Sequence, residues 1–376
     1  MMERLLYLGA THKTAAVALR ERLAAGPERL PVLLAAIRRH VDEAVVLSTC
    51  GRFEVYAIAD EDARRGWAAS LGEVLGQPAD ELVQLIQVRA GSDAALHLMR
   101  VAAGLESQIV GEEQILGQVR AAFDTAARVR AMGPVLSALF RGAIHAGRRV
   151  RRETRLGRGG RSFARSAVNE VCRHVGAERA PRVLILGSGQ LAHEVTDRCR
   201  EAGIRKFVFV SRHPERARMM AARYGGIAFS LEQVSKANVA VDAVIGCAGV
   251  RRTLVDVPLA EALVARRNEQ VCPVLFVDLG MPRNIEAGVG DVPGATLRDL
   301  DTLGAIETVH DVDVAEAEAI LSEEMQRFRT WLAGRAVAPR IVRLLEGAEG
   351  LTMNDAREVR RSLHGPIIRL KEEAAA

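Results

Sequence analysis

Hydrophobic and polar positions along the 376-residue chain change period several times. Near the amino terminus, short apolar runs at 4–9, 43–47 and 53–59 predict strands, and the spacing over 15–25 predicts a helix. Over 92–144, apolar residues recur every three or four positions, which predicts several helices. The first part of the chain is therefore expected to form a small sheet with helices on one face.

The pattern changes after a glycine- and arginine-rich stretch at 156–161, which is a candidate domain boundary. Beyond it, strand-like runs alternate with helical segments, and this alternation predicts an open parallel sheet with helices on both faces. The expected strands are 182–186, 206–210, 241–245 and 274–277.

One long helical pattern without an internal proline spans 312–335, and an amphipathic helical tail continues to the end of the chain. Such an extension has too little core to stand alone, so we expect it to pack against a second copy. The expected fold class is α/β multidomain: an α+β domain over 1–155, a Rossmann-like domain over 156–305, and a long helix with a helical dimerisation domain over 306–376.

Composition argues against membrane-spanning, secreted, disulfide-bonded and metal-binding classes of protein. Hydrophobic residues make up 49% of the chain, and no segment has the length of a membrane span or the pattern of a secretory leader. A cytoplasmic protein without membrane contact is expected. The five cysteines are scattered without paired or histidine-associated spacing, which argues against disulfides and against a metal site.

The net charge of +5 would favour a polyanionic partner without requiring one. The arginines are densest in one segment, and its interpretation stays open between a solvated linker face and a phosphate contact. These residues are Arg148, Arg149, Arg151, Arg152, Arg155, Arg158, Arg161 and Arg165.

A dinucleotide-binding loop is indicated directly after the buried run at 182–186. Gly187 would permit the tight turn, Gly189 would let the backbone approach a pyrophosphate, and Ala192 would allow close helix packing. The alternative is an ordinary strand-to-helix turn. The candidate cofactor-binding residues here are Gly187, Ser188, Gly189, Gln190, Leu191 and Ala192.

The end of the second strand indicates which dinucleotide would bind. An NAD enzyme usually places a carboxylate there, but this chain has Ser211 and Arg212, which can bind a 2′-phosphate. NADPH is therefore the expected cofactor. Arg216 and Arg218 could add to this site or could belong to a solvated helix face.

Cys50 is the candidate nucleophile because it lies in a turn between two predicted strands, within Ser48-Thr49-Cys50-Gly51-Arg52. Arg52 or a histidine from elsewhere could lower its pKa and favour the thiolate. Free cysteines are also commonly buried and inert, so spacing alone leaves both roles open. With a reduced nicotinamide, a thiolate could form a thioester whose carbonyl accepts a hydride to release an aldehyde.

Several motifs together resemble the glutamyl-tRNA reductase family along nearly the whole chain. They are Gly9-Ala10-Thr11-His12-Lys13-Thr14-Ala15 with Arg20-Glu21, Leu47 to Tyr56 around Cys50, His97-Leu98, Gly104-Leu105-Glu106-Ser107, Gly111 to Val119, Val150-Arg151-Arg152-Glu153-Thr154, the dinucleotide loop, and Asp278 to Arg283.

The resemblance implies a catalytic domain, an NADPH domain and a carboxy-terminal dimerisation domain joined by a long helix in a V-shaped homodimer. It implies that glutamyl-tRNA and NADPH give glutamate-1-semialdehyde, the entry to tetrapyrrole synthesis by the five-carbon route. It also suggests glutamate-1-semialdehyde aminomutase as a further partner.

The resemblance also implies residue roles. Cys50 would be the nucleophile, with His97 near it and needed for activity. The glutamyl group would be held by Thr49, Gly51, Arg52, Ser107, Glu112, Glu113, Gln114 and Gln118. Arg52 can pair with a carboxylate and Glu112 with an α-ammonium group. From the residues alone, His97 could equally be a core histidine, and Glu112 and Gln118 could be solvated positions on a helix.

Three positions depart from the family pattern: Gly51 stands where asparagine is usual, Glu106 where aspartate is, and Glu113 where proline is. Gly51 removes a polar side chain next to the nucleophile and loosens the backbone. Two alternatives therefore stay open: a divergent paralogue that reduces another acyl-tRNA or acyl thioester, and a non-catalytic scaffold that binds tRNA or the aminomutase.

Overall fold

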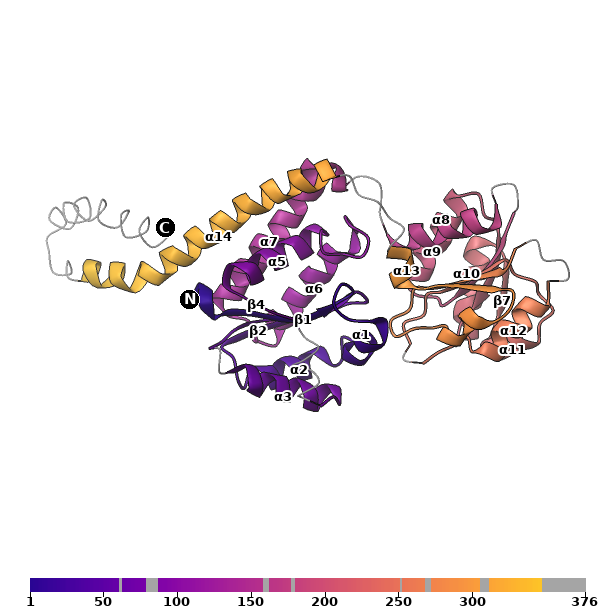
Figure 1. Ribbon diagram of the computed structural model, residues 1–376, viewed down its shortest axis with the longest axis horizontal. Coiled ribbons are helices and arrows are strands. Elements are labelled where there is room, and N and C mark those ends of the chain that lie inside the picture. The colour runs from indigo at the N-terminus through magenta and orange to yellow at the C-terminus, as the bar shows by residue number, and fades with distance from the viewer. Residues whose placement is uncertain are drawn as a thin grey trace.

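An antiparallel sheet in the order β2-β3-β1-β4 forms the centre of the first domain. Its strands are β1 (Leu5–Thr11), β2 (Glu43–Ser48), β3 (Arg52–Ile58) and β4 (Gln87–Ala90). Every residue of β1 and β3 is buried, which requires cover on both faces. Figure 1 shows α2 and α3 on one side of this sheet and α5, α6 and α7 on the other. The expectation of helices on one face only was wrong.

The sequence shows why both faces are covered. Leu5, Leu6, Tyr7 and Leu8 form a continuous apolar run without alternation, and such a run is typical of a strand buried on both sides. The first domain contains η1 (Met2–Arg4), α1 (Val17–Leu23), α2 (Leu30–Ile37), α3 (Ala63–Leu75), α5 (Gly91–Ala103), α6 (Gln114–Arg128), α7 (Pro134–Glu153) and η2 (Arg155–Gly157).

The second domain is an all-parallel sheet in the order β10-β9-β8-β5-β6-β7, which confirms the Rossmann-like expectation. Its strands are β5 (Arg182–Leu186), β6 (Lys206–Val210), β7 (Ile227–Phe229), β8 (Ala243–Gly246), β9 (Val274–Asp278) and β10 (Ala295–Arg298). Its helices are α8 (Phe163–Val175), α9 (Gln190–Glu201), α10 (Pro214–Tyr224), α11 (Leu231–Lys236), α12 (Val257–Ala265), η3 (Ala287–Asp291) and α13 (Leu300–Gly304).

The long helix α14 runs from Asp311 to Glu346, further in both directions than the apolar pattern predicted. Its first half packs against α7 and α5 of the first domain, while the remainder extends away from it (Figure 1). The structure, a computed structural model, describes residues 1–60, 63–78, 87–157, 162–176, 180–250, 252–267, 272–304 and 311–346. The structure does not describe the predicted tail after 346, nor Arg158 and Arg161. The expected boundaries at 156–161 and 305–306 lie partly or wholly outside the described residues as well.

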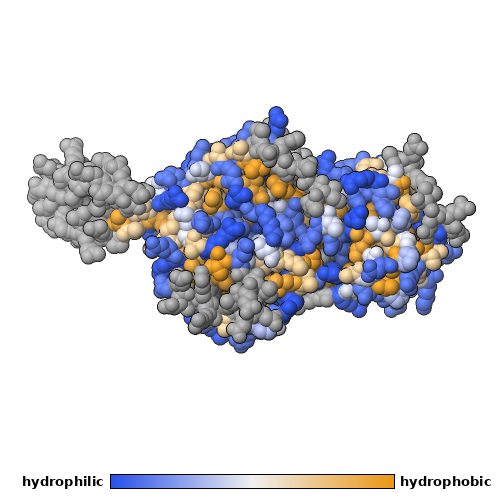
Figure 2. Space-filling model, in the orientation of Figure 1, coloured by the Kyte–Doolittle hydropathy of each residue, from blue (hydrophilic) through white to orange (hydrophobic). Residues whose placement is uncertain are grey.

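The visible surface is mostly hydrophilic, with hydrophobic residues in scattered patches that include the extended part of α14 (Figure 2). Trp331 on that helix is exposed and stacks on Phe328. Within the described ranges, no helix combines the length and apolarity needed to cross a bilayer.

Candidate active site

Cys50 occupies a tight turn between β2 and β3. The backbone N–H of Thr49 donates to the Arg52 carbonyl oxygen at 2.8 Å, and that of Gly51 donates to the Thr49 hydroxyl at 3.2 Å. The Gly51 carbonyl oxygen accepts a hydrogen bond from the backbone N–H of His12 at 2.9 Å. Cys50 itself is half-buried and packs against a hydrophobic cluster that joins Ile109 of the first domain to the core of the second domain. The predicted nucleophile therefore lies where the two domains meet.

Gly51 does not need to be glycine for steric reasons. A Cβ atom at this position would meet only the Oε1 of Gln108 at 3.6 Å, an ordinary van der Waals distance. The turn can therefore hold a side chain such as the asparagine usual in the family. Glycine instead leaves open space beside Cys50.

Burial, together with the negative charge of Glu112, raises the pKa of the Cys50 thiol to about 12. Arg20 and Arg52 act in the opposite direction but do not outweigh burial. The expectation that nearby positive charge would lower this pKa is thus only partly met. In this state of the protein the sulfur is a thiol, and it needs activation before it can attack.

Alternate residues of β3 place three polar side chains on one face of the strand. Arg52 Nη1 donates to Glu54 Oε1 at 2.9 Å, and the Tyr56 hydroxyl donates to Glu54 Oε2 at 2.8 Å. His97 of α5 joins the same carboxylate, with its Nε2 3.1 Å from Glu54 Oε1. The charge of Arg52 and the hydrogen bond from His97 hold the pKa of Glu54 at about 2 although burial opposes this. All four residues are buried.

This network defines what His97 does in the structure. Its Nδ1 is buried and has no hydrogen-bond partner among the described residues, and its ring packs edge-on against Tyr7. His97 is therefore linked to the nucleophile turn through Glu54 and Arg52. Arg52 also donates to the carbonyl oxygen of Glu106, which ties the turn to the loop that carries Ser107.

Glu112 is the buried carboxylate whose negative charge raises the pKa of Cys50. Burial raises the pKa of Glu112 to about 7, with a smaller contribution from Glu194 of the second domain, although Arg52 and Arg151 act to lower it. The Ser107 side chain also lowers the pKa of this carboxylate, so Ser107 and Glu112 lie close together, although the buried Ser107 hydroxyl has no hydrogen-bond partner among the described residues. Both are buried, which contradicts the alternative that Glu112 is a solvated helix position.

The remaining candidate ligands lie at the start of α6. Gln114 is exposed, and its Nε2 donates to Glu194 Oε2 of α9 at 2.9 Å, a contact between the two domains. Glu113 is exposed beside Arg120, Arg148 and Arg151 in a shallow cleft. Gln118 is half-buried one turn further along the helix. The roles of all three toward a substrate stay predictions.

The glycine loop after β5 has the geometry that a dinucleotide requires. Gly187 has a φ of +128°, and a Cβ there would lie 2.9 Å from the backbone of Cys247, so only glycine fits. Nothing lies within 4 Å of the position of a Cβ on Gly189, which leaves the backbone open to a pyrophosphate. Ala192 is fully buried in the helix that follows. Gln190 is exposed and Leu191 half-buried.

A cleft lies beside this loop and contains both proposed selectivity residues. Ser211 is buried and its hydroxyl lies 3.3 Å from the Ser188 hydroxyl, whereas Arg212 is exposed. The cleft is lined by Leu186, Gly187, Ser188, Gly189, Val210, Ser211, Arg212, His213, Arg216, Ala248, Gly249, Val250 and Leu254. Arg216 thus belongs to the cleft, while Arg218 pairs with Glu215 on the surface. The residues present fit a dinucleotide with a 2′-phosphate.

The arginine-rich segment has mixed roles, which neither earlier interpretation anticipated. Arg149 pairs with Glu323 and Glu324 of α14 at 2.8 and 2.9 Å, so it joins two helices. Arg151 donates to the carbonyl oxygens of Ala102, Gly147 and Glu112, each at 2.9 Å. Much of the positive charge in the described part of this segment therefore stabilises the fold through ion pairs and hydrogen bonds.

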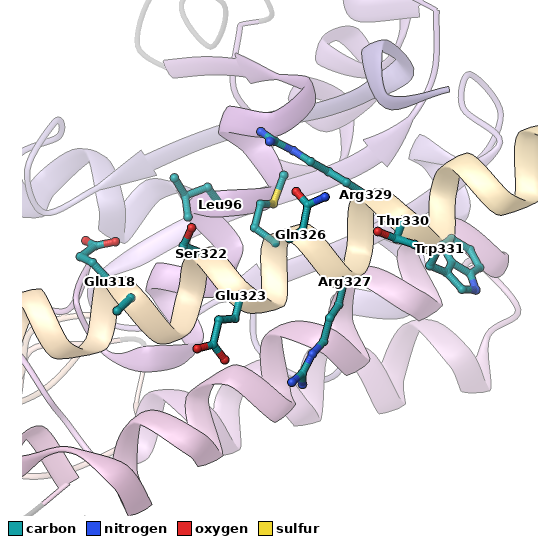
Figure 3. Close-up of a pocket in the computed structure, with 11 residues that line it drawn as sticks. Leu96, Glu318, Ser322, Glu323, Gln326, Arg327, Arg329, Thr330 and Trp331 are labelled. Carbon is teal, nitrogen blue, oxygen red and sulfur yellow. The ribbon is translucent and has the colours of Figure 1, made fainter. Parts of the chain in front are cut away.

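Another hollow lies along α14, away from Cys50 and the glycine loop. Figure 3 shows Ser322 and Gln326 of this helix near Leu96 of α5. Its other lining residues are Glu318, Ala319, Glu323, Met325, Arg327, Arg329, Thr330 and Trp331. None of the predicted site residues lines it, so it is separate from the candidate active site.

Sequence reasoning assigned no role to Glu54, Tyr56, Gln108 or Asp301, and it noted Arg20 only as part of a motif. Arg52, Glu54 and Tyr56 occupy every second position of a buried strand. This spacing could have indicated that Glu54 and Tyr56 share a face of the strand with Arg52. Asp301 lies almost 200 positions from Gln108, and its contact with Gln108 depends on the arrangement of the two domains. No local pattern could have revealed that contact.

Comparisons with known proteins agree with this geometry. Residues 8–154 match the family described as Glutamyl-tRNAGlu reductase, N-terminal domain, and residues 170–306 match Shikimate / quinate 5-dehydrogenase. Glutamyl-tRNA reductase from Rubrobacter xylanophilus is 32% identical over 98% of this chain and 92% of that protein. The one from Sorangium cellulosum is 34% identical over 96% of this chain and 72% of that protein. The solved structure from Methanopyrus kandleri is 27% identical, with a TM-score of 0.49, over 99% of this chain and 93% of that one.

Proposed function

The chain belongs to the glutamyl-tRNA reductase family, and on that premise we propose that it reduces glutamyl-tRNA to glutamate-1-semialdehyde with NADPH, through a thioester on Cys50. The observation that carries this proposal is the position of Cys50. Its turn belongs to the first domain, and the side chain packs on a hydrophobic cluster shared by Ile109 of that domain and the core of the dinucleotide domain. A group acylated there lies at the edge of the domain that would deliver the hydride.

The reaction needs two steps from the chain. The Cys50 sulfur bonds to the glutamyl carbonyl carbon, the bond from that carbon to the terminal ribose oxygen of the tRNA breaks, and this oxygen takes up a proton. The cleft beside Gly187 would hold NADPH, which would supply the hydride that brings the acyl carbon to the oxidation level of an aldehyde. The carbon–sulfur bond then breaks, which frees the product and returns the Cys50 thiolate.

Substrate binding itself would activate the thiol. Glu112 raises the pKa of Cys50 through its negative charge. When the α-ammonium group of the glutamyl ester pairs with Glu112, this charge is neutralised and the pKa of Cys50 falls. The free enzyme thus keeps its sulfur less reactive, and pairing of the correct ester with Glu112 favours the thiolate.

In the direct test, the protein is incubated with glutamyl-tRNA and with other aminoacyl-tRNAs, with and without NADPH. Glutamyl-tRNA alone should acylate Cys50, and NADPH should convert the adduct to an aldehyde. Acylation by a different aminoacyl-tRNA would support the divergent paralogue. A protein that binds tRNA but forms no adduct and no aldehyde would be the scaffold, and the proposed function would be rejected.

Glu112→Gln should increase the reactivity of the Cys50 thiol and weaken the binding of glutamyl-tRNA. Without the negative charge, iodoacetamide should modify Cys50 several times faster at a given pH, because the pKa of the thiol falls. The KM for glutamyl-tRNA should rise about tenfold or more, as expected for the loss of a charge-assisted contact. Mass spectrometry of the Cys50 peptide and steady-state kinetics measure the two effects.

The pH dependence follows from the pKa of Glu112 at about 7. As the pH falls through 7, Glu112 takes up a proton and loses its attraction for the ammonium group, so the KM of the wild-type protein should rise. Glu112→Gln should lack this rise, whereas Glu73→Gln, an exposed position on α3, should keep it. An identical pH profile in wild type and Glu112→Gln would contradict the assignment.

Arg212→Ala should weaken NADPH binding about 10- to 100-fold, because a guanidinium–phosphate contact contributes roughly 1.5–3 kcal/mol. NADH lacks the 2′-phosphate, so its affinity should change little. Fluorescence titration of both nucleotides measures the ratio. Arg218→Ala is the control, since Arg218 lies on α10 but does not line the cleft. Equal weakening of NADPH and NADH would remove Arg212 from the phosphate site.

The same proposal extends to the partners that the family resemblance suggests. The protein would act in the cytoplasm as a homodimer formed through its carboxy-terminal part and would pass its aldehyde to glutamate-1-semialdehyde aminomutase. The exposed Trp331 and the extended part of α14 support a further protein contact in this region.

A further inference from the structure

Helix α1 carries two consecutive charged residues that both bind the second domain. Arg20 is buried, and its Nη2 donates to the Asp301 carboxylate at the start of α13. Glu21 Oε1 accepts from the backbone N–H of Arg283 at 2.7 Å and from its Nε at 3.0 Å. These contacts join segments more than 250 positions apart, so they exist only while the two domains are in contact.

The same residues also hold the acyl site. Arg20 Nη1 donates to the carbonyl oxygen of Cys50 at 2.9 Å, so one guanidinium contacts both the nucleophile turn and Asp301. Asp301 also accepts from Nε2 of Gln108, which follows Ser107 in the loop beside Glu112. Both loops around the sulfur are therefore connected to a single carboxylate of the other domain.

The contacts on the second domain lie at a functional edge of its sheet. Arg283 follows β9 and Asp301 follows β10, at the carboxyl ends of neighbouring parallel strands. Ligands of open parallel sheets bind outside these ends. The Asp278 carboxylate at the end of β9 accepts from the backbone N–H groups of Asn284 and Ile285, each at 2.8 Å, which fixes the segment containing Arg283. This edge therefore presents a rigid surface to α1.

We propose that Arg20, Glu21, Arg283 and Asp301 form a latch that positions acylated Cys50 for hydride transfer. This inference rests on the proposed function and names positioning residues for its second step. Acylation needs only the first domain, whereas reduction needs the acyl carbon to be held at a fixed distance and orientation relative to the dinucleotide domain. Loss of the latch should therefore separate the two steps.

A buried arginine supports this role more than a purely structural one. Removing the charge of Arg20 from water is costly, and hydrophobic residues of similar volume would hold the domains together as well or better. The guanidinium instead supplies two directed hydrogen bonds, one to the residue that carries the acyl group and one to the partner domain. Such bonds fix a distance and an orientation, which hydride transfer requires.

Asp301→Ala is the sharpest test, because Asp301 is partly exposed and its loss should not prevent folding. In single-turnover experiments without NADPH, acylation of Cys50 by glutamyl-tRNA should proceed at the wild-type rate. After NADPH is added to the preformed thioester, the aldehyde should appear about 10- to 100-fold more slowly, as expected for a misplaced reacting group. Asp301→Glu should restore part of the rate.

Asp299→Ala is the matched control. Asp299 Oδ1 accepts from the backbone N–H of Thr302 at 3.0 Å and so caps the same short helix, and among the described residues its side chain hydrogen-bonds only within this helix end. It should leave both steps unchanged. Small-angle X-ray scattering supplies a readout independent of turnover, and Asp301→Ala combined with Glu21→Ala should increase the radius of gyration of the free protein.

The outcomes are distinguishable. A wild-type protein that never acylates Cys50 would reject the proposed function and not the latch. If Asp301→Ala slows acylation and reduction in parallel, or slows neither, Asp301 does not position the thioester and the latch is overturned. An unchanged radius of gyration in the double variant overturns it as well.

Discussion

Replacing Cys50 with serine is expected to abolish both the covalent glutamyl adduct and the aldehyde product. A serine hydroxyl is a far weaker nucleophile than a thiolate, and nothing in the turn is placed to remove its proton. Its side chain is nearly the size of cysteine, so the contact with the core of the second domain should survive. Intact-mass measurement after incubation with glutamyl-tRNA detects the adduct, and a carbonyl-trapping reagent detects the aldehyde.

Cys172→Ser is the matched control for this prediction. Cys172 is also half-buried, lies on α8 and packs against the same core, but it lies outside the nucleophile turn. It should retain adduct and aldehyde at wild-type levels. Both variants should bind NADPH normally, because the cleft beside Gly187 contains neither residue. Aldehyde formation by Cys50→Ser would exclude the thioester route while leaving the family assignment intact.

The sequence predicted those features of the fold that depend on short-range pattern. The parallel strands of the second domain, the glycine loop and the turn with Cys50 each follow from local hydrophobicity and from residues with special backbone requirements. Gly187 is the clearest case, since its positive φ and the close approach of Cys247 permit no side chain. The short strands β4, β7 and β10 were missed, because each has only three or four residues and gives little periodic signal.

The electrostatics of the site could not be predicted from the same pattern. The sequence places Arg52 two residues from Cys50, which suggested a lowered thiol pKa. In the structure Arg52 is paired with Glu54, while burial and Glu112 dominate the pKa of Cys50. The sign of such a shift depends on how deeply the sulfur is covered and on which charges lie around it in three dimensions. Neither can be read from the spacing of residues along the chain.

Glu54→Ala is expected to destabilise the first domain by about 3–5 kcal/mol, the usual cost of breaking one side of a buried ion pair. Glu54 is fully buried, and its carboxylate accepts hydrogen bonds from Arg52 and Tyr56 and contacts His97. Its loss would leave the positive charge of Arg52 buried without a partner carboxylate. Hydrogen exchange of the β1 and β3 amides measures this effect, because it reports the opening of one domain in a chain with several.

The pKa of Glu54 points in the same direction. Its pKa is about 2, compared with 4.5 for an unperturbed glutamate, although burial acts to raise it. The charge of Arg52 therefore favours the ionised carboxylate in the folded protein. Asp124→Ala breaks an exposed ion pair with Arg120 in the same domain and should change stability by no more than about 1 kcal/mol. If both variants exchange alike, the Arg52–Glu54 pair does not stabilise the strand that holds the nucleophile turn, and another contact must hold Cys50 in place.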